Sequence, residues 1–419
     1  MDSGHAAAGI GRRPRAALLT LGLLSAFGPI SLDLYLPALP LIGFDLRASD
    51  ASTQLTLSAA LGGLALGQLI VGPLSDRVGR RRPLLVGLAG FAVMSIACAL
   101  APGIHALIAA RLGQGLCGAA GLVVARAVVR DAFPDDRIAR VFSLLMLING
   151  LAPVLAPLLG GVLLHVMSWR GLFWVLALIG AGIGVLTTAA LPETLPPDRR
   201  HRGGLRFLAA AVHEVSRDRL FGGATAVLAL TSAALFTYIS LSSFVLQSAF
   251  GLSPSEFSAV FAINSVGIVI GGRVSGLLLR RFDSFALLGG GLGTMTAATA
   301  MLLLAAVSGW GLPGLLPPLF VAIGTVGVVL PNATALALRR HARSAGTASA
   351  LLGSMQYLAG ALAGPLVSAR GASATAMAAG MTATIGTGLL VWTIVLRPVR
   401  RELHGPPPSA AEIVEEIWP

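Results

Sequence analysis

Residues 72–81 read Gly-Pro-Leu-Ser-Asp-Arg-Val-Gly-Arg-Arg, and they stand between two long apolar runs, near 53–74 and 83–102. Each run has close to the roughly 20 apolar residues that a helix needs to cross a bilayer. The stretch therefore predicts a short basic loop that joins two membrane-spanning helices. The same alternation of apolar run and polar loop continues through the chain in both directions.

The composition agrees with a chain built largely of membrane spans. Of 419 residues, 55% are hydrophobic and 11% are charged, whereas soluble proteins have roughly 25% charged residues. This excludes both a water-soluble globule and a disordered chain. Twelve apolar runs are found, and twelve helices would use roughly 240 residues. The runs lie near 16–38, 53–74, 83–102, 105–129, 138–163, 171–191, 220–244, 256–279, 284–306, 313–337, 346–369 and 373–396.

A weak internal repeat divides these runs into two sets of six. Residues 72–81 match 276–285, and residues 144–159 match 351–367, at nearly the same offset. We therefore predict an all-α integral membrane protein with 12 transmembrane helices, in two pseudo-symmetric six-helix bundles around a central cavity. The predicted parts are an N-terminal tail (1–15), a first bundle (16–191), a basic linker (192–219), a second bundle (220–396) and a C-terminal tail (397–419).

The arginines predict the orientation. All 30 basic residues other than histidine are arginine; 24 lie in the tails and on one set of loops, and 3 lie in the opposite loops. By the positive-inside rule both termini are cytoplasmic. This distribution explains the net charge of +12 without a nucleic-acid partner. The first apolar run is too long for a cleaved signal peptide, so we expect it to remain as a span.

Residues 72–81 resemble the loop between the second and third helices of the major facilitator superfamily. The resemblance implies a cytoplasmic gate, in which Asp76 faces a helix N-terminus across the two halves and Arg80 pairs with Asp131. A solvated anchor at the membrane surface is the alternative. The second half has Arg280 where the first has Asp76, so it lacks the same latch. The implied gate residues are Gly72, Asp76, Arg77, Gly79, Arg80, Arg81 and Asp131.

Narrower motifs resemble the proton-coupled drug exporters of the bicyclomycin-resistance (Bcr/CflA) subfamily. Those motifs lie at 31–37, 111–115, 126–131, 152–161, 191–195 and 345–350. The resemblance implies drug:proton antiport, with Pro153, Pro157, Gly160 and Gly161 as the antiporter motif and hinge. Ala156 stands where the subfamily usually has glycine, and it keeps the small side chain that close helix packing needs.

Asp33 and Arg111 are the expected proton-coupling residues. An ionisable group inside a span costs about 2.5 to 3.5 kcal/mol on insertion scales, so it usually faces a cavity or a partner. With the first span ending near residue 38, Asp33 lies roughly 7 Å below the outer boundary. Arg111 lies at a similar depth in the fourth span. We expect Arg111 to influence the protonation of Asp33, and a purely structural pair is the alternative.

Six further polar or amphipathic side chains inside spans are candidates to line the substrate cavity. Each alone is as readily explained by a hydrogen bond between helices. Together they indicate a mostly apolar cavity with few fixed donors, which suits amphipathic drugs better than sugars. They are Tyr35, Gln114, Asn149, Tyr238, Asn264 and Gln356.

The function expected from these features is proton-driven export of drugs or similar small molecules across the bacterial inner membrane by a monomer. The expected partners are the cargo, protons and the lipid bilayer. We expect neither a cofactor nor a metal site, and no phosphate-binding loop for ATP is found. The alternatives are a proton-coupled transporter of one metabolite and, from another class, a non-transporting receptor. An enzyme is not expected, because no convergent nucleophile and base are found.

Overall fold

The computed structural model describes residues 14–133, 135–200, 217–341, 345–369 and 371–399. Within these ranges the regular secondary structure is helical, and no strand occurs. Residues 201–216 of the predicted linker and most of the two predicted tails lie outside the described residues. The predicted boundaries between the two bundles and the linker therefore stay predictions.

Six long helices make up the first half of the described chain. Two short elements, η1 (Leu36–Ala38) and α3 (Leu39–Asp45), follow the first of them and continue the same span. The bounds of the long helices are α2 Pro14–Asp33, α4 Asp50–Val78, α5 Arg81–Ala99, α6 Ile104–Ala132, α7 Asp135–Leu163 and α8 Trp169–Ala190.

Six more long helices make up the second half. They are α10 Arg219–Ser243, α11 Pro254–Leu278, α12 Ser284–Val307, α13 Gly311–Leu338, α14 Ala345–Ser368 and α15 Ala374–Val391. The π-helical segments η3 (Phe244–Ala249) and η4 (Trp392–Leu396) extend α10 and α15. Among the described residues, 11 helices are long and apolar enough to cross a membrane, and α7 contributes a shorter apolar stretch, Ile148–Leu163. The predicted all-α fold with twelve long helices is confirmed.

Polar caps begin several of the spans. Asp218 accepts a hydrogen bond from the backbone N–H of Leu220 at 2.9 Å, at the start of α10. Ser253 and Glu256 form a reciprocal capping box at the start of α11. Such side chains satisfy the backbone donors that a helix leaves without partners at its N-terminus. Short polar loops therefore suffice to end one apolar span and begin the next.

The first span differs from the sequence prediction, which ended it near residue 38. α2 stops at Asp33, and η1 and α3 carry the span on to Asp45. Pro37 and Pro40 stand at the first turns of η1 and α3. Proline lacks an N–H and clashes with the preceding turn, so it interrupts a continuous α-helix but is tolerated where a new helix begins. Asp33 consequently lies about three turns inside the span rather than near its outer end.

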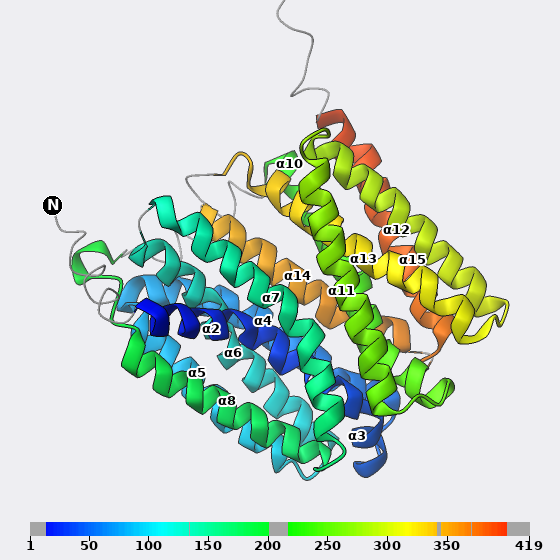
Figure 1. Ribbon diagram of the computed structural model, residues 1–419, viewed down its shortest axis with the longest axis horizontal. Helices are drawn as coiled ribbons and strands as arrows, with labels where there is room; N and C mark the ends of the chain where they lie inside the picture. The colour runs from blue at the N-terminus through cyan, green and yellow to red at the C-terminus, as the bar shows by residue number, and fades with distance from the viewer. Residues whose placement is uncertain (1–13, 134, 201–216, 342–344, 370, 400–419) are drawn as a thin grey trace, which may run out of the picture.

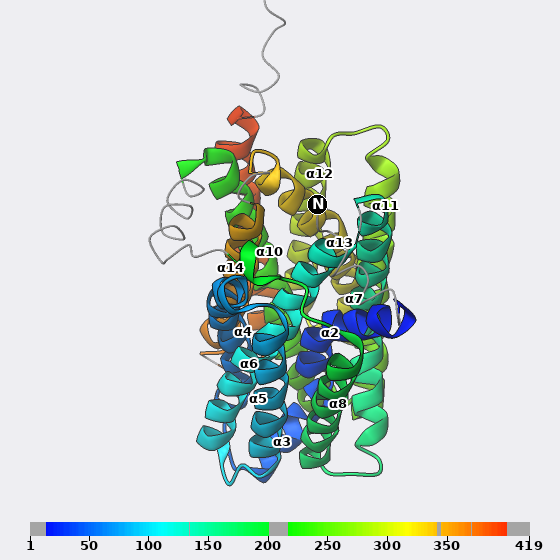
Figure 2. The same cartoon turned by 90° about the vertical axis from the view of Figure 1, so that its left-hand side faces the viewer.

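Two pairs of helices join the halves, α4 with α14 and α7 with α11. The Ser354 hydroxyl donates to the carbonyl oxygen of Ala65 at 3.3 Å. In the other pair, the Ser265 hydroxyl donates to the carbonyl oxygen of Pro153, also at 3.3 Å. In Figure 1, α5 and α8 lie at the edge of the first half that is farthest from the second half, and Figure 2 shows this face of the molecule.

The halves meet at the end of the molecule where α3 lies. In Figure 1, α7 and α11 converge toward that end and diverge toward the opposite one. Beside α3, the Ser243 hydroxyl donates to the carbonyl oxygen of Leu36 at 2.8 Å, and the Gln247 amide donates to that of Pro37 at 3.2 Å. These bonds attach the second half to the interrupted part of the first span.

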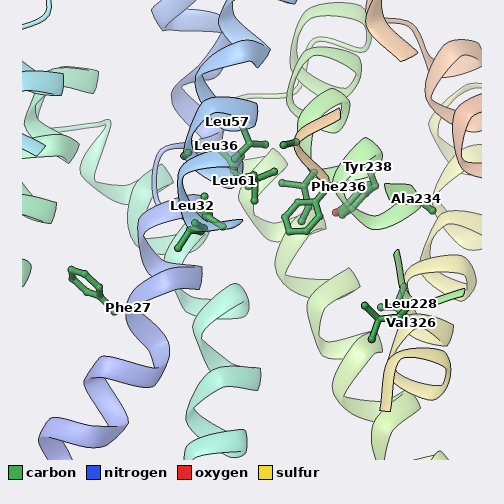
Figure 3. Close-up of a cluster of buried hydrophobic side chains, with 14 of the residues drawn as sticks. Phe27, Leu32, Leu36, Leu57, Leu61, Leu228, Ala234, Phe236, Tyr238 and Val326 are labelled. Carbon is green, nitrogen blue, oxygen red and sulfur yellow. The ribbon is translucent and has the colours of Figure 1, made fainter. Parts of the chain in front are cut away.

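The apolar core continues across the junction of the halves. Figure 3 shows Leu57 and Leu61 of α4 on the side of the first half that faces Phe236 of α10, and all three side chains are buried. Large apolar side chains are also exposed on the outer faces of the helices, such as Leu178 (71% exposed) and Leu366 (74%). An apolar outer surface of this kind is suited to contact with lipid.

Candidate functional site

Asp33 is the only buried carboxylate among the described residues, with 5% of its surface exposed. It is the last residue of α2, directly before the break in the first span. Within the described part of the chain it has no hydrogen bond and no ion pair. A buried carboxylate without a partner is energetically unfavourable. The Asp33 side chain is therefore suited to take up and release a proton or a cationic ligand.

Tyr238 and Asn264 of the second half lie together near Asp33. The Asn264 amide donates to the Tyr238 hydroxyl at 3.0 Å. The Tyr238 ring stacks on Phe261, with ring centroids 5.4 Å apart and planes 19° apart. The charge of Asp33 reaches the Tyr238 hydroxyl. Two of the six predicted cavity residues thus come together with the predicted proton carrier, at the junction of the halves.

Tyr357 of α14 belongs to the same cluster, although the sequence analysis does not single it out. Its hydroxyl interacts electrostatically with Asp33 and with Arg126 of α6. Its ring lies 6.1 Å from the ring of Phe236. The chain contains only three tyrosines, and all three lie in spans, which is the signal that could have identified Tyr357. Gln356, the predicted cavity residue, is its partly buried neighbour.

Arg111 does not pair with Asp33 in this structure. It is 1% exposed, and its Nη1 donates to the carbonyl oxygen of Ser31 at 3.2 Å and to the amide oxygen of Gln114. Its guanidinium lies over the Tyr35 ring, 4.2 Å from the centroid. No ion pair joins Arg111 to a carboxylate among the described residues. Ser31 is in the last turn of α2, so the Arg111 cation stands where helix carbonyls lack partners and the dipole is negative.

Gln114 and Tyr35 therefore lie in a polar network inside the first half. The Gln114 amide donates to the Ser95 hydroxyl at 2.6 Å, and the Tyr35 hydroxyl is 3.3 Å from that of Thr56. Both side chains are buried. The hydrogen bonds occupy the polar groups of these two predicted cavity residues, and the structure does not bring the two residues together with Tyr238 and Asn264.

Asn149, the remaining predicted cavity residue, bridges two helices of the first half. Its amide on α7 donates to the Ser25 hydroxyl of α2 at 3.2 Å. Its side chain is partly exposed. The contact is of the interhelical kind that the sequence analysis leaves open for each of these residues.

Arg80 is the centre of the predicted gate. Its Nε donates to Asp131 at 2.8 Å, and its Nη1 donates to Ser75 at 2.8 Å and contacts Asp76. Burial lowers the pKa of the Arg80 guanidinium, but the hydrogen bonds and charges of Asp131 and Asp76 outweigh burial and raise it above its usual value. The expected Arg80–Asp131 pair is present, and its role in gating stays a prediction.

Glu193, which lies in the motif at 191–195, is a further member of this cluster and was not among the predicted gate residues. Its carboxylate accepts the backbone N–H of Arg80 at 2.8 Å and that of Arg81 at 3.2 Å. An anion at this place satisfies the free donors at the start of α5. Gly79 has a φ of +100°, and a Cβ there would run into the Glu193 carboxylate. Only glycine fits that position well.

The other predicted gate residues make fewer contacts than Arg80. Asp76 is 45% exposed, and its ion pair is with Arg80 in its own half rather than with the second half. Arg81 donates to the carbonyl oxygen of Thr188 at 2.9 Å. Arg77 is exposed, and a Cβ at Gly72 would meet only ordinary contacts. The latch that the resemblance implies across the halves is not formed among the described residues.

The predicted hinge residues of α7 lie at close helix contacts. A Cβ at Gly160 would run into the backbone carbonyl of Leu34, directly after Asp33. A Cβ at Gly161 would lie 2.6 Å from the Ser258 hydroxyl of α11. Pro153 and Pro157 stand inside α7, and the Pro153 carbonyl accepts from Ser265 across the junction. These glycines let α7 approach both the break in the first span and the second half.

Comparisons with known proteins agree with this architecture. The model of the Major Facilitator Superfamily matches residues 21–365. The "Uncharacterized MFS-type transporter YdgK" of Bacillus subtilis is 39% identical over 381 residues, covering 90% of this chain and 95% of that protein. The "Bicyclomycin resistance protein homolog" of Haemophilus influenzae is 29% identical over 350 residues, covering 84% and 88%.

A solved structure shows the same fold. The crystal structure of the peptide transporter POT in complex with sulfate superimposes with a TM-score of 0.75, covering 96% of this chain and 98% of that chain. The two sequences are 18% identical. At this identity the likeness concerns the fold alone.

Proposed function

Since the chain belongs to the Major Facilitator Superfamily and is thus a multi-pass membrane transporter, we propose that it exports drugs or similar small amphipathic molecules in exchange for protons. The family consists of transporters, so the expectation that the chain is not an enzyme is confirmed. The motifs that resemble the bicyclomycin-resistance subfamily and the relative named for bicyclomycin resistance support drugs as the cargo. The proposed setting is the bacterial inner membrane, with both termini in the cytoplasm.

The burial of Asp33 at the junction of the halves is the main observation that supports the proposal. It is a buried carboxyl group without a protein partner among the described residues, and its charge reaches hydroxyls on α10 and α14 of the other half. A change of its charge therefore alters the electrostatics of the contact between the halves. A carboxyl group in this position can tie proton binding to a change in how the halves pack.

The proposed cycle uses competition at this carboxyl group. In the described conformation the halves are joined beside α3 and diverge at the other end, which is the cytoplasmic end in the proposed orientation. A cargo molecule enters from that end and displaces the proton from Asp33. After the halves rearrange, a proton from outside binds Asp33 and releases the cargo. Each exchange moves one proton inward and one cargo molecule outward.

The neighbouring side chains favour a flat, partly apolar cargo. Phe236, Tyr238, Phe261 and Tyr357 present rings near the junction, and the Tyr238 hydroxyl already accepts from Asn264. Aromatic faces bind apolar and cationic groups without fixing one hydrogen-bond pattern. Asp33 adds an acceptor for a cationic or hydroxyl group. Such a site accepts varied amphipathic molecules more readily than one sugar or peptide.

Transport in inside-out membrane vesicles tests the proposal. Vesicles acidified inside are given ethidium, chloramphenicol or bicyclomycin, with and without an uncoupler. We expect uptake of at least one compound, its loss with the uncoupler, and a fall of about 100-fold or more in Asp33→Asn, the scale for removing a positioned proton-transfer group. Asp50→Asn, which changes an exposed carboxylate at the start of α4, is the matched control and should transport normally.

Two results would overturn the proposal. Uptake of these compounds that persists with the uncoupler would exclude proton coupling. Binding of a compound without flux, in vesicles that contain correctly inserted protein, would instead favour the receptor alternative.

A further inference from the structure

Five buried polar side chains lie where α4, α10 and α14 meet. Each has at least one polar atom without a hydrogen-bond partner among the described residues. Gln54 lacks partners for both amide atoms, although it is 0% exposed. The other four each have a hydroxyl without a partner and are 7% exposed or less. The four hydroxyl residues are Ser58, Thr237, Ser240 and Ser368.

Gly364 of α14 lies close to two of these hydroxyl groups. A Cβ at Gly364 would lie 2.7 Å from the Ser240 hydroxyl and 3.8 Å from the Ser58 hydroxyl. The two hydroxyls, one from each half, therefore flank a single backbone position. Ser368 is one turn further along α14 on the same face, and Gln54 is one turn further along α4 from Ser58. We name this group of five side chains the polar seam.

The polar seam leads toward the Asp33 cluster. Thr237 is one turn from Ser240 on the same face of α10, and it directly precedes Tyr238. Tyr357 is two turns from Gly364 on the same face of α14. The hydroxyls of both tyrosines are within electrostatic reach of Asp33. The seam therefore extends from near the α3 end of the molecule toward the turns of α10 and α14 that carry Tyr238 and Tyr357.

Ordered water is a ligand suited to these side chains. Buried polar groups in proteins are nearly always hydrogen-bonded, and ordered water serves where protein partners are missing. Elsewhere in α10 a serine satisfies itself within its own helix, as the Ser232 hydroxyl does by donating to the Leu228 carbonyl at 2.8 Å. The seam hydroxyls have no such bond. A row of hydroxyls and one amide, each able to donate and accept, is suited to hold a chain of water molecules.

We infer that the polar seam holds ordered water and conducts a proton from the outer solution to Asp33 after cargo has bound and the cytoplasmic end has closed, while the halves are still closed beside α3. The bonds from Ser243 to Leu36 and from Gln247 to Pro37 bar larger molecules there. A proton enters from a hydronium ion outside. Each water or hydroxyl in the row accepts one proton and passes one on, and the last proton binds the Asp33 carboxylate. The inference rests on the proposed role of Asp33 as the proton carrier.

The double variant Ser58→Ala/Ser240→Ala tests the inference in proteoliposomes that contain a pH-sensitive dye, with whichever of the three compounds above the wild type exports. We expect proton-driven transport to fall at least about fivefold, which is less than the roughly 100-fold loss expected on removing the carboxyl group itself. Exchange of labelled for unlabelled compound, which needs no protonation step, should stay within about twofold of wild type. The single variant Ser58→Thr keeps both the hydroxyl at position 58 and that of Ser240. It should carry out proton-driven transport at the wild-type rate.

The matched control is Ser242→Ala, because the Ser242 hydroxyl is also buried without a partner but lies on the opposite side of α10. It should leave both rates unchanged. Equal proton-driven rates in wild type and double variant, or equal losses in proton-driven transport and exchange, would overturn the inference. So would an experimental density map that resolves water elsewhere and shows none within about 3.2 Å of the Gln54 amide. A wild type without proton coupling would instead overturn the proposed function.

Discussion

The guanidinium of Arg111 lies over the ring of Tyr35, with its central carbon 4.2 Å from the ring centroid. Tyr35 stands in the break between α2 and η1, and Arg111 also donates to the Ser31 carbonyl at the end of α2. The arginine thus stabilises both sides of the break that positions Asp33. Its contribution to the site is to hold the backbone there, and it makes no ion pair with the carboxylate among the described residues.

Arg111→Lys is therefore expected to destabilise the protein. A lysine ammonium lacks the planar face that stacks on Tyr35, and its shorter side chain does not place a donor where the Arg111 Nη1 reaches both Ser31 and Gln114. We expect a loss of roughly 1 to 3 kcal/mol, the scale of one charged hydrogen bond with a cation–π contact. Thermal unfolding of the purified protein measures it, with the exposed Arg77→Lys as control. Unchanged stability with an altered pH dependence of transport would instead indicate a direct action on Asp33.

Gly160→Ala is expected to disturb the same region from α7. Its new methyl group would run into the Leu34 carbonyl, and backbone cannot move aside as a flexible side chain can. Overpacking of this kind costs about 1 to 3 kcal/mol, and we expect transport to fall with stability. Gly182→Ala, which has nothing within 4 Å of the added Cβ, is the control. Equal stability and transport for both variants would contradict the close approach of α7 to α2.

Glu193→Ala is expected to loosen the start of α5. It removes the acceptor for the backbone N–H groups of Arg80, Arg81 and Leu195. Leaving such donors without a protein partner costs roughly 1 to 3 kcal/mol. Hydrogen exchange of the loop between α4 and α5 should speed up accordingly. Glu193→Gln keeps one acceptor oxygen and should lie between the alanine variant and wild type. Equal exchange in all three proteins would show that the Glu193 contact does not order the loop.

Asp76→Asn tests the gate that the resemblance implies. In the described conformation Asp76 pairs with Arg80 within one half, so the variant should fold and bind cargo normally. If Asp76 holds the halves together when they close at this end, its loss should shift the population toward the present arrangement by about 1 kcal/mol, or roughly fivefold. Labelling of single reporter cysteines on each face measures the shift. Unchanged labelling on both faces would argue against the latch.

Most of the fold could be predicted because hydropathy acts on whole segments. Apolar runs of span length and arginines confined to alternate loops are sufficient for an all-α chain with twelve spans. The prediction ended the first span near residue 38 and missed the break after Asp33, although Pro37 and Pro40 were visible in the sequence. Proline marks where a helix is interrupted, but whether the chain leaves the membrane or continues the span depends on packing against α10.

The site could be predicted only in part, because the contacts within it also depend on how the helices pack. The cost of burying a charge singles out Asp33, and polarity within spans singles out Tyr238 and Asn264. Which polar side chains meet depends on how the twelve helices rotate about their axes, and the apolar runs do not encode that. Hence Arg111 was expected beside Asp33 but contacts Tyr35 and Ser31, and the place of Tyr357 beside the Asp33 cluster was missed.

Proton release on cargo binding shows whether Asp33 carries the proton that is exchanged for cargo. Purified protein in weakly buffered detergent solution with a pH-sensitive dye is mixed with a compound that it exports, and binding is followed separately by fluorescence or calorimetry. We expect release of about one proton per bound molecule from wild type and none from Asp33→Asn. Proton release that persists in Asp33→Asn at equal binding would contradict the role of Asp33 as the coupling carboxyl group.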